Sequence, residues 1–356
     1  MKTLWKDKMT PKERMKAFAA GEQLDRIVCM PMVTDQAYSL AGGTMSKYYH
    51  SATLMAQAQI NAFETYELDS VGSGPGLFGI AEAIGTKLVF PEDNVPYVSI
   101  PAISSYENLG NMNLIDPYRS GRLPIFLEAL KIIQEAVKER VSVGCAVAGP
   151  ITTAAAVRGT DSFLKDMRRC PEMVHRLLQY VTDNTILFID VLCDIGIKPS
   201  IADPVASGTM ISEKHFREFA KPYLKQYSDR IIQRWGSGPF VHICGDTTKI
   251  WSDMVDFGAT VLSLDNQVDL AEAKNEVGHR ACLSGNVRPN TLWRGTPQQV
   301  AIEVKECLRK AYDNPKGFIL SSGCGLPVGT PVDNVIAMMD AARQYGKYPI
   351  DPDRLK

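Results

Sequence analysis

The 356-residue sequence contains no run that approaches the roughly 18 consecutive apolar residues of a membrane-spanning helix. It also has no excess of charge of either sign. Its 39 Lys and Arg residues balance 40 Asp and Glu residues, which leaves a net charge of -1. This balance gives no electrostatic basis for binding nucleic acid. The charged N-terminal sequence has no apolar stretch typical of a signal peptide. We therefore expect no membrane association.

Cysteine is sparse, and several common enzyme motifs are missing. Eight cysteines scattered over the chain do not form a disulfide framework, so we expect a cytoplasmic, reducing location. Cys29, Cys145, Cys193 and Cys282 lie in apolar segments and are expected to be small buried side chains. There is no dinucleotide-binding glycine loop after the first apolar run, no Gly-x-Ser-x-Gly elbow and no HExxH helix. These absences argue against the corresponding nucleotide-binding enzymes, hydrolases and proteases.

The sequence does contain short apolar runs that alternate with longer segments of helical period. The apolar runs are nearly continuous, as expected of strands that are covered on both faces. Eight such strands and their helices predict an α/β fold, a closed parallel (β/α)8 TIM barrel with active-site groups at the carboxyl ends of the strands. A doubly wound sheet is the alternative. The predicted strands are 27–33, 69–73, 141–148, 200–203, 240–243, 260–264, 280–283 and 318–321.

We expect the whole chain, residues 1–356, to form one barrel domain. We expect an N-terminal helical extension at 1–24 and a polar, frayed tail at 347–356. The stretch 74–121, after the second strand, is too long for a simple connection, and we interpret it as an excursion that forms a lid or wall of the substrate cavity. The predicted helices are 11–20, 51–66, 127–140, 171–192, 213–235, 247–257, 270–277, 297–312 and 331–345.

Two short motifs carry the chemistry. His242 and Cys244 close the apolar run 239–243, and Cys324 follows the run 318–321. Residues two apart in a strand point to the same side, so His242 and Cys244 can face one ion. Because all barrel strands end at one face, Cys324 can reach the same rim. Two thiolates and an imidazole are typical ligands of a catalytic zinc with an open fourth position.

The alternative interpretation is a hydrogen-bonded core histidine and two inert thiols. Glycines at 245, 323 and 325 favour the metal site, because glycine permits tight and unusual backbone angles around the ligands. An open zinc position can hold a substrate thiol as its thiolate. Our hypothesis is that the protein activates a thiol as a methyl acceptor.

Two carboxylates are expected to act catalytically beside this site. Asp203 closes the strand 200–203, and Asp265 follows the strand 260–264. Either can orient His242, fill the fourth zinc position or help to deprotonate an incoming thiol. For both, a helix cap or a turn is the alternative role.

Substrate contacts are expected from Asn286, Arg288 and Tyr38. Arg288 lies after the seventh strand, where barrels often bind anions, and can pair with a sulfonate, carboxylate or phosphate. A surface ion pair is its alternative fate. Tyr38 can line an aromatic pocket with Tyr48, Tyr49 and Phe78, although such residues more often pack in cores.

Five motifs carry a resemblance to a known family. With these motifs the chain resembles the uroporphyrinogen decarboxylase superfamily, and within it the corrinoid-dependent branch typified by methylcobamide:coenzyme M methyltransferase. The resemblance extends from about residue 12 to the last helix. The motifs are AEAIGTKLVFPED (81–93), IADPVAS (201–207), HICG (242–245), SGNV (284–287) and GCGLP (323–327).

The resemblance implies a (β/α)8 barrel with zinc held by a His-x-Cys pair and a distant Cys, at positions that match His242, Cys244 and Cys324. It implies transfer of a methyl group from a methylcobamide, a cobalamin-type corrinoid carried by a small partner protein, to a zinc-bound thiolate. A free thiol with a pKa near about 8.5 is mostly protonated at neutral pH, whereas a metal-bound thiol is deprotonated and still nucleophilic.

One departure bears on the substrate. Decarboxylases of the superfamily grip their substrate's carboxylates with arginines just after the first strand, but this chain has no arginine between Arg26 and Arg119. Porphyrinogen decarboxylation is therefore disfavoured. Two alternatives stay open. One is a corrinoid-dependent O-demethylase of methoxylated aromatics, and the other is a non-catalytic corrinoid-binding protein with a structural zinc.

Overall fold

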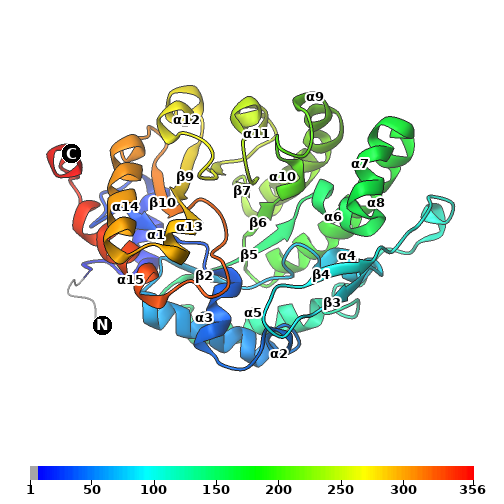
Figure 1. Ribbon diagram of the computed structural model, residues 1–356, viewed down its shortest axis with the longest axis horizontal. Helices are drawn as coiled ribbons and strands as arrows, with labels where there is room; N and C mark the ends of the chain where they lie inside the picture. The colour runs from blue at the N-terminus through cyan, green and yellow to red at the C-terminus, as the bar shows by residue number, and fades with distance from the viewer. Residues whose placement is uncertain (1–6) are drawn as a thin grey trace.

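The computed structural model describes residues 7–356, and its centre is a curled sheet of eight parallel strands (Figure 1). The order of the strands around the sheet is β1-β10-β9-β8-β7-β6-β5-β2. The strands are β1 (Val28–Cys29), β2 (Ser70–Gly72), β5 (Ser142–Ala148), β6 (Pro199–Ala202), β7 (Phe240–His242), β8 (Val261–Ser263), β9 (Cys282–Val287) and β10 (Phe318–Ser322).

The two end strands of this order are joined. The amide of Asp69, next to β2, donates to the carbonyl of Cys29 in β1 at 3.4 Å, and the Cys29 amide donates to the Asp69 carboxylate at 2.8 Å. The sheet therefore curls into a TIM-like barrel. The prediction of an α/β fold with eight parallel strands is confirmed.

Helices surround the sheet (Figure 1). Several begin at side-chain caps that the sequence supplies: Thr10 and Thr296 form capping boxes with residues three further on, and Asp269 caps α12. The α-helices are α1 (Pro11–Ala20), α2 (Met45–Tyr49), α3 (Ala52–Tyr66), α4 (Gly79–Ile84), α5 (Leu123–Val137), α6 (Pro150–Arg158), α7 (Thr160–Arg169), α8 (Pro171–Asp194), α9 (Glu213–His215), α10 (Lys221–Trp235), α11 (Trp251–Asp256), α12 (Leu270–Val277), α13 (Pro289–Arg294), α14 (Pro297–Ala311) and α15 (Val332–Tyr345).

Short helical turns complete the connections. The 3-10 turn η1 lies between β1 and α2, and the π-helical turn η4 divides the predicted helix 213–235 into α9 and α10. The turns are η1 (Thr34–Leu40), η2 (Leu109–Asn111), η3 (Pro204–Ala206), η4 (Phe216–Ala220), η5 (Thr248–Ile250) and η6 (Pro352–Leu355).

The long connection after β2 contains an antiparallel hairpin of β3 (Lys87–Val89) and β4 (Tyr97–Ile100). In Figure 1 this cyan hairpin lies at the edge of the molecule remote from both termini. The same connection contains α4 and η2, and it returns to the barrel at α5.

Two sequence-based expectations about the chain were wrong. The C-terminal tail is not frayed, because Ile350 and Leu355 are buried against the barrel. The seventh strand continues to Val287, so that Asn286 lies within β9 and not after it. Residues 1–6 of the expected N-terminal extension lie outside the described residues.

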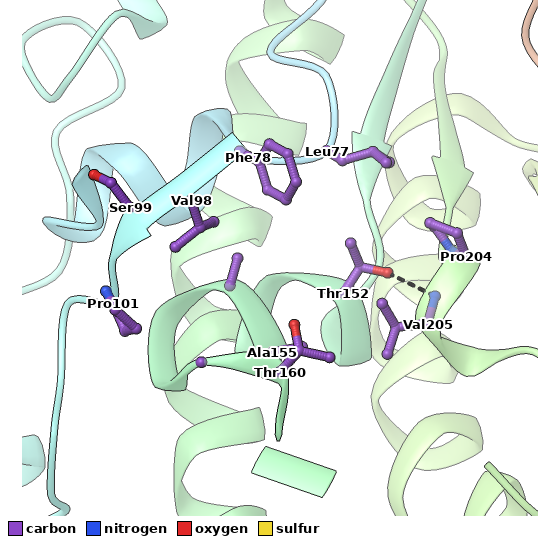
Figure 2. A pocket seen from close by; sticks show the side chains of 12 residues that line it. Leu77, Phe78, Val98, Ser99, Pro101, Thr152, Ala155, Thr160, Pro204 and Val205 are labelled. Carbon is purple, nitrogen blue, oxygen red and sulfur yellow. Dashed lines mark hydrogen bonds between the residues drawn. The ribbon is translucent and has the colours of Figure 1, made fainter. Parts of the chain in front are cut away.

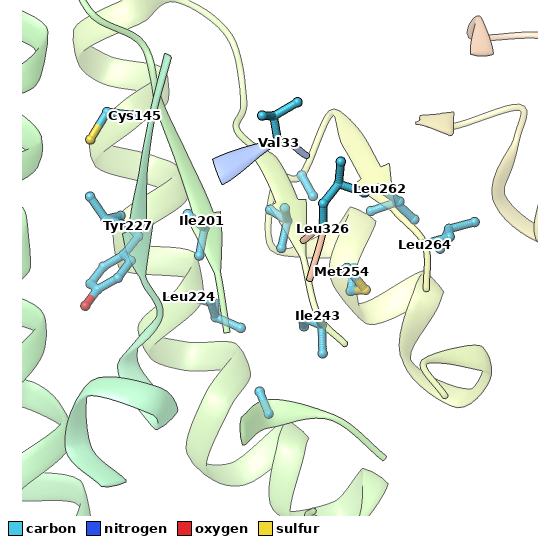
Figure 3. Packing of buried hydrophobic residues seen from close by; sticks show 14 of the residues in the cluster. Val33, Cys145, Ile201, Leu224, Tyr227, Ile243, Met254, Leu262, Leu264 and Leu326 are labelled. Atoms are coloured by element: carbon cyan, nitrogen blue, oxygen red, sulfur yellow. The ribbon is translucent and has the colours of Figure 1, made fainter. Parts of the chain in front are cut away.

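The core fills the barrel and the space between the sheet and its helices. Figure 3 shows Ile201 of β6 and Leu262 of β8 among apolar side chains from other elements, including Val33, Leu326 and Leu224. Val33 precedes η1 and Leu326 follows β10, so the connections above the strands also contribute to the core. Both connections are therefore held firmly at the carboxyl end of the sheet.

The amino end of the barrel is closed by buried charges. The Asp69 carboxylate accepts from Arg14 of α1 at 2.5 Å and from Arg26 at 2.6 Å, and the three side chains are at most 3% exposed. Asp7 and Asp25 pair with the same arginines. Each charge has an opposite partner, as a buried ion needs.

Candidate metal centre

Three soft side chains meet at the carboxyl end of the sheet. His242 is the last residue of β7, Cys244 follows two residues later, and Cys324 lies two residues beyond β10. Strands β8 and β9 separate β7 from β10, so residues 80 positions apart come together across the barrel mouth. Among residues 7–356 this is the one group of three or more His, Cys, Asp or Glu side chains arranged to hold a metal ion.

The three donor atoms lie close enough together to share one metal ion. His242 Nε2 lies 3.2 Å from Cys244 Sγ, the two Sγ atoms are 3.6 Å apart, and all three donor atoms lie within 4.8 Å of one another. Zinc bonds of about 2.3 Å to sulfur and 2.0–2.1 Å to nitrogen give tetrahedral ligand separations of roughly 3.5–3.8 Å. The donor atoms suit zinc, and the 3.6 Å separation of the two sulfurs lies in this range, whereas the 3.2 Å separation of His242 Nε2 and Cys244 Sγ is slightly shorter.

A serine hydroxyl orients the imidazole. His242 Nδ1 lies 3.1 Å from Ser263 Oγ, which is buried on the adjacent strand β8. The two residues are paired in the β7–β8 register. This contact leaves Nε2 facing the sulfurs. We expected Asp203 or Asp265 to orient His242, but the hydrogen-bond partner of its ring on this side is Ser263.

The pKa values of the two thiols are shifted in opposite directions. Hydrogen bonding from Cys244, followed by that from His242, lowers the pKa of Cys324 despite burial. The same hydrogen bond to Cys324 raises the pKa of Cys244, because a second thiolate would stand 3.6 Å from the first. Bringing two sulfurs this close favours a cation between them, which would stabilise both thiolates.

The turn that carries Cys244 is held by Asp265. The Gly245 amide donates to Asp265 Oδ2 at 2.9 Å, and the Gln267 amide donates to Oδ1 at 3.0 Å. Gly245 has φ +74°, a conformation that favours glycine. The structure therefore places Asp265 beside the cluster as a buried acceptor that fixes the ligand turn.

Asp203 lies on the other side of β7 and is bonded to α6. Its fully buried carboxylate accepts from the Thr152 amide at 2.8 Å, the Thr152 hydroxyl at 2.7 Å and the Ile151 amide at 3.3 Å. Burial raises the pKa of Asp203 to about 6, against these hydrogen bonds. Its contact with His242 is through the backbone, because the Asp203 amide donates to the His242 carbonyl.

The side chains of Asn286 and Arg288 both interact with other residues of the protein. The Asn286 amide group donates to the carbonyls of Asp265 and Val268, and so ties β9 to the connection after β8. Arg288 has a side chain that is 64% exposed and pairs with Glu303 at 3.1 Å. Arg288 thus forms a surface ion pair, which was the alternative to its expected role in binding substrate.

Tyr38 belongs to a group of aromatic side chains. It lies in η1, half-buried, with its ring edge toward Tyr48, which in turn contacts Tyr49. The half-buried Asp35 in the same turn is hydrogen-bonded to Tyr49, and its burial raises its pKa.

Sequence reasoning missed Ser263, Thr152 and Asp35. Ser263 and Thr152 act on residues that lie 21 and 51 positions away, so nothing near them in the sequence marks their roles. Asp35 did carry a signal, because it is an acidic residue just after the first strand, where barrel sites are built.

A cavity of about 470 Å³ opens beside α6. Figure 2 shows Phe78 and Leu77 from the connection after β2 on one side, and Pro204 and Val205 on another. The Val205 amide donates to the Thr152 hydroxyl at 3.1 Å, so the residue that holds Asp203 also lines the cavity. No charged side chain lines it. The connection 74–121 thus supplies part of its wall.

None of the helices in residues 7–356 is long and apolar enough to cross a membrane.

Comparisons with known proteins agree with this architecture. Residues 10–345 match the uroporphyrinogen decarboxylase (URO-D) family. The methylcobamide:CoM methyltransferase MtaA of Methanosarcina barkeri is 30% identical over 94% of this chain and 98% of its own length. A uroporphyrinogen decarboxylase of Chlorobaculum tepidum is 31% identical over 60% of this chain and 62% of its own length.

A solved structure is similar along nearly the whole chain. The methyltransferase from Methanosarcina mazei superposes with a TM-score of 0.85 at 28% identity and covers 95% of this chain and 99% of that chain. The fold, the family match and the methyltransferase relatives therefore all indicate the same family. The chain belongs to the uroporphyrinogen decarboxylase family and, within it, to the methyltransferase branch.

Proposed function

We propose that the protein is a zinc-dependent methyltransferase that moves a methyl group between a corrinoid carried by a partner protein and a small thiol. The observation that carries this proposal is the convergence of His242, Cys244 and Cys324 at one rim of the barrel. The group has three members, which suits a catalytic site more than a structural zinc site, since structural sites are usually closed by four protein ligands.

Each nearby residue has a defined part in the proposed site. His242, Cys244 and Cys324 would hold the ion, Ser263 keeps the Nε2 lone pair of His242 directed at it, and Asp265 fixes the turn of Cys244. When bound, zinc supplies a positive charge that lowers the pKa of a thiol near it.

The reaction is a displacement at carbon. The thiol releases its proton to solvent, its sulfur attacks the methyl carbon, and a carbon–sulfur bond forms as the carbon–cobalt bond breaks. The electron pair of that bond stays on cobalt, which becomes Co(I). The barrel mouth must therefore admit the corrinoid face of a partner protein, and the relatives named for methylcobamide support this partner.

Metal analysis and a methyl-transfer assay test the proposal. Purified protein should contain about one zinc per chain and should convert a small thiol to its methyl thioether with free methylcobalamin as donor. The thioether is measured by mass spectrometry, and cobalamin reduction is followed by its absorbance. Full activity without zinc, or in the Cys324→Ala variant, would rule out this function.

A second candidate is corrinoid-dependent O-demethylation of methoxylated aromatics. The uncharged cavity beside Thr152, with Phe78 in its wall, favours a small aromatic ligand. The same assay distinguishes the two functions when Co(I) cobalamin is supplied with a panel of methoxyarenes. Formation of methylcobalamin from a methoxyarene, with no thiol methylation, would favour O-demethylation.

Uroporphyrinogen decarboxylation is disfavoured despite the family name. The segment 30–38, which follows β1, contains no Lys or Arg, so the carboxylates of a porphyrinogen would have no cationic partner there. A direct assay with uroporphyrinogen III tests this conclusion, and product formation would contradict it.

A further inference from the structure

Two of the eight cysteines lie in contact with each other. The Sγ atoms of Cys244 and Cys324 are 3.6 Å apart, although the two residues are 80 positions apart in the chain. All eight cysteines are free, and within the described residues no other cysteine thiol is hydrogen-bonded to a second thiol. The fold therefore brings one particular pair of thiols close enough to react with each other.

This pair of thiols is also more accessible than most of the other cysteines. Cys244 and Cys324 are both half-buried, so a small oxidant dissolved in water can reach them. Cys170 and Cys193 are half-buried as well, but neither is hydrogen-bonded to another thiol. The remaining cysteines are buried: Cys29, Cys145, Cys282 and Cys307.

A disulfide between the two sulfurs requires only a small movement. Because a sulfur–sulfur bond is about 2.04 Å long, the two Sγ atoms would have to approach by about 1.6 Å from their separation of 3.6 Å. Both cysteines lie beyond the ends of their strands, since β7 ends at His242 and β10 ends at Ser322. Rotation of the two side chains in these connections can supply the movement without changing the pairing of the strands.

We propose that Cys244 and Cys324 form a reversible disulfide in the metal-free protein when a peroxide is present. One thiol loses its proton, and its sulfur attacks a peroxide oxygen. The oxygen–oxygen bond breaks, hydroxide leaves and takes up that proton to give water, and the sulfur becomes a sulfenic acid. The second thiol then attacks this sulfur, the sulfur–sulfur bond forms and a second water leaves. Two thiols are thus oxidised, and one hydrogen peroxide is reduced to two waters.

The disulfide would remove both sulfur donors from the metal centre. A cysteine binds a metal as its thiolate, so the oxidised protein would keep only His242 of the three donors. A dithiol reverses the change by thiol–disulfide exchange. The contact between Cys244 and Cys324 would therefore make metal binding sensitive to oxidants, and this sensitivity does not depend on methyl transfer.

Counting the free thiols of the full-length protein tests the proposal. Metal is removed with a chelator, the folded protein is treated with hydrogen peroxide, and the remaining thiols are alkylated with N-ethylmaleimide in denaturant. Mass spectrometry should find eight maleimides per chain before oxidation and two fewer afterwards. Peptide mapping should find Cys244 linked to Cys324, and dithiothreitol should restore all eight thiols. The oxidised protein should bind no zinc until it is reduced.

Two controls separate the effect of the fold from ordinary thiol reactivity. Peroxide treatment of the urea-unfolded chain should give no preference for this pair, because the two thiols then have 80 residues between them. Cys193→Ser, a change at a half-buried cysteine on α8, should still lose two thiols on oxidation. Cys324→Ser should give no peptide cross-linked through Cys244.

The outcomes distinguish this proposal from the proposed function. Eight free thiols after peroxide treatment, or a cross-link that mainly joins another pair of cysteines, would overturn the disulfide. A disulfide in a protein that binds no zinc when reduced would support this proposal and contradict the zinc-dependent function. Zinc binding and methyl transfer without any disulfide would do the opposite.

Discussion

Two buried aspartates at opposite ends of the barrel show how differently the two ends use charge. Asp69 lies at the amino end and is bonded to Arg14 and Arg26. Asp203 lies at the carboxyl end, equally buried, but its partners are the amides of Ile151 and Thr152 and the hydroxyl of Thr152. One carboxylate is neutralised by cations and the other only by dipoles.

This difference between the partners of Asp69 and Asp203 is typical of TIM barrels, in which the amino end contributes to stability and the carboxyl end contains the active site. At the amino end, opposite charges close the barrel. At the carboxyl end, the Asp203 carboxylate is held by amide and hydroxyl groups. Replacing single side chains at each end of the barrel tests this difference.

The largest effect is expected from removing Asp69. Asp69→Ala leaves Arg14 and Arg26 buried close together without the carboxylate between them, and losing one partner of a buried ion network destabilises a protein by about 3–5 kcal/mol. We expect this loss in the free energy of unfolding measured with urea, with zinc content retained in the folded fraction. A stability equal to that of the wild type would contradict the structural role assigned to the amino end.

At the mouth, Cys324→Ala should act on function and little on stability. We expect zinc to be lost and methyl transfer to fall by more than about 1000-fold, since even residues that merely support metal ligands change affinity or activity by 10–100-fold. Zinc is measured by mass spectrometry and activity with methylcobalamin. Cys193→Ala, a half-buried cysteine on α8, is the matched control and should retain both.

Asp203 should make stability depend on pH. Its pKa rises from the ordinary 3.8 to about 6 in the folded protein, mainly because of burial. Between these values the folded state binds more protons than the unfolded state, so this group's contribution to stability falls as pH rises from 4 to 6 and is constant above 7. The total change is up to about 3 kcal/mol.

The variant Asp203→Asn isolates this contribution. Unfolding of the wild type and the variant is followed with urea from pH 4 to pH 7.5. The wild type should lose stability relative to the variant across pH 4–6, and parallel curves would show that Asp203 does not titrate there.

The smallest effect is expected at Ser263. Ser263→Ala removes the hydrogen bond to His242 Nδ1 and should weaken zinc affinity about 10- to 100-fold, as measured by competition with a chelator. Ser284 provides a matched control, because it is paired with Ser263 in the β8–β9 register and its buried hydroxyl has no hydrogen-bond partner within the described structure. Equal zinc affinity in Ser263→Ala and Ser284→Ala would contradict the orienting role.

Most strands could be predicted because each is a short apolar run. The predicted strand 240–243 differs from β7 by one residue, whereas the prediction 280–283 missed most of β9. Residues 284–286 are Ser, Gly and Asn, which carry no apolar signal, and they form a strand because β10 pairs with them. The helix α6 was missed for a related reason: Pro150–Val157 is buried on all sides and shows no amphipathic period.

For the site, the sequence indicated which side chains meet but not what supports them. His242, Cys244 and Cys324 have donor types and strand-end positions that predict their meeting. The contacts of Ser263 with His242 and of Thr152 with Asp203 depend on strand register and helix placement, which are set by long-range packing. The metal ligands stay a prediction until zinc is measured.

The order in which the ligands occur along the chain affects how the protein is made. Cys244 is synthesised 80 residues before Cys324, and His242 precedes Cys244. A nascent chain that has emerged only as far as β9 offers one imidazole and one thiol, a pair that binds metal weakly. All three donors come together only after β10 has paired between β9 and β1. Metal would therefore bind after the barrel has folded.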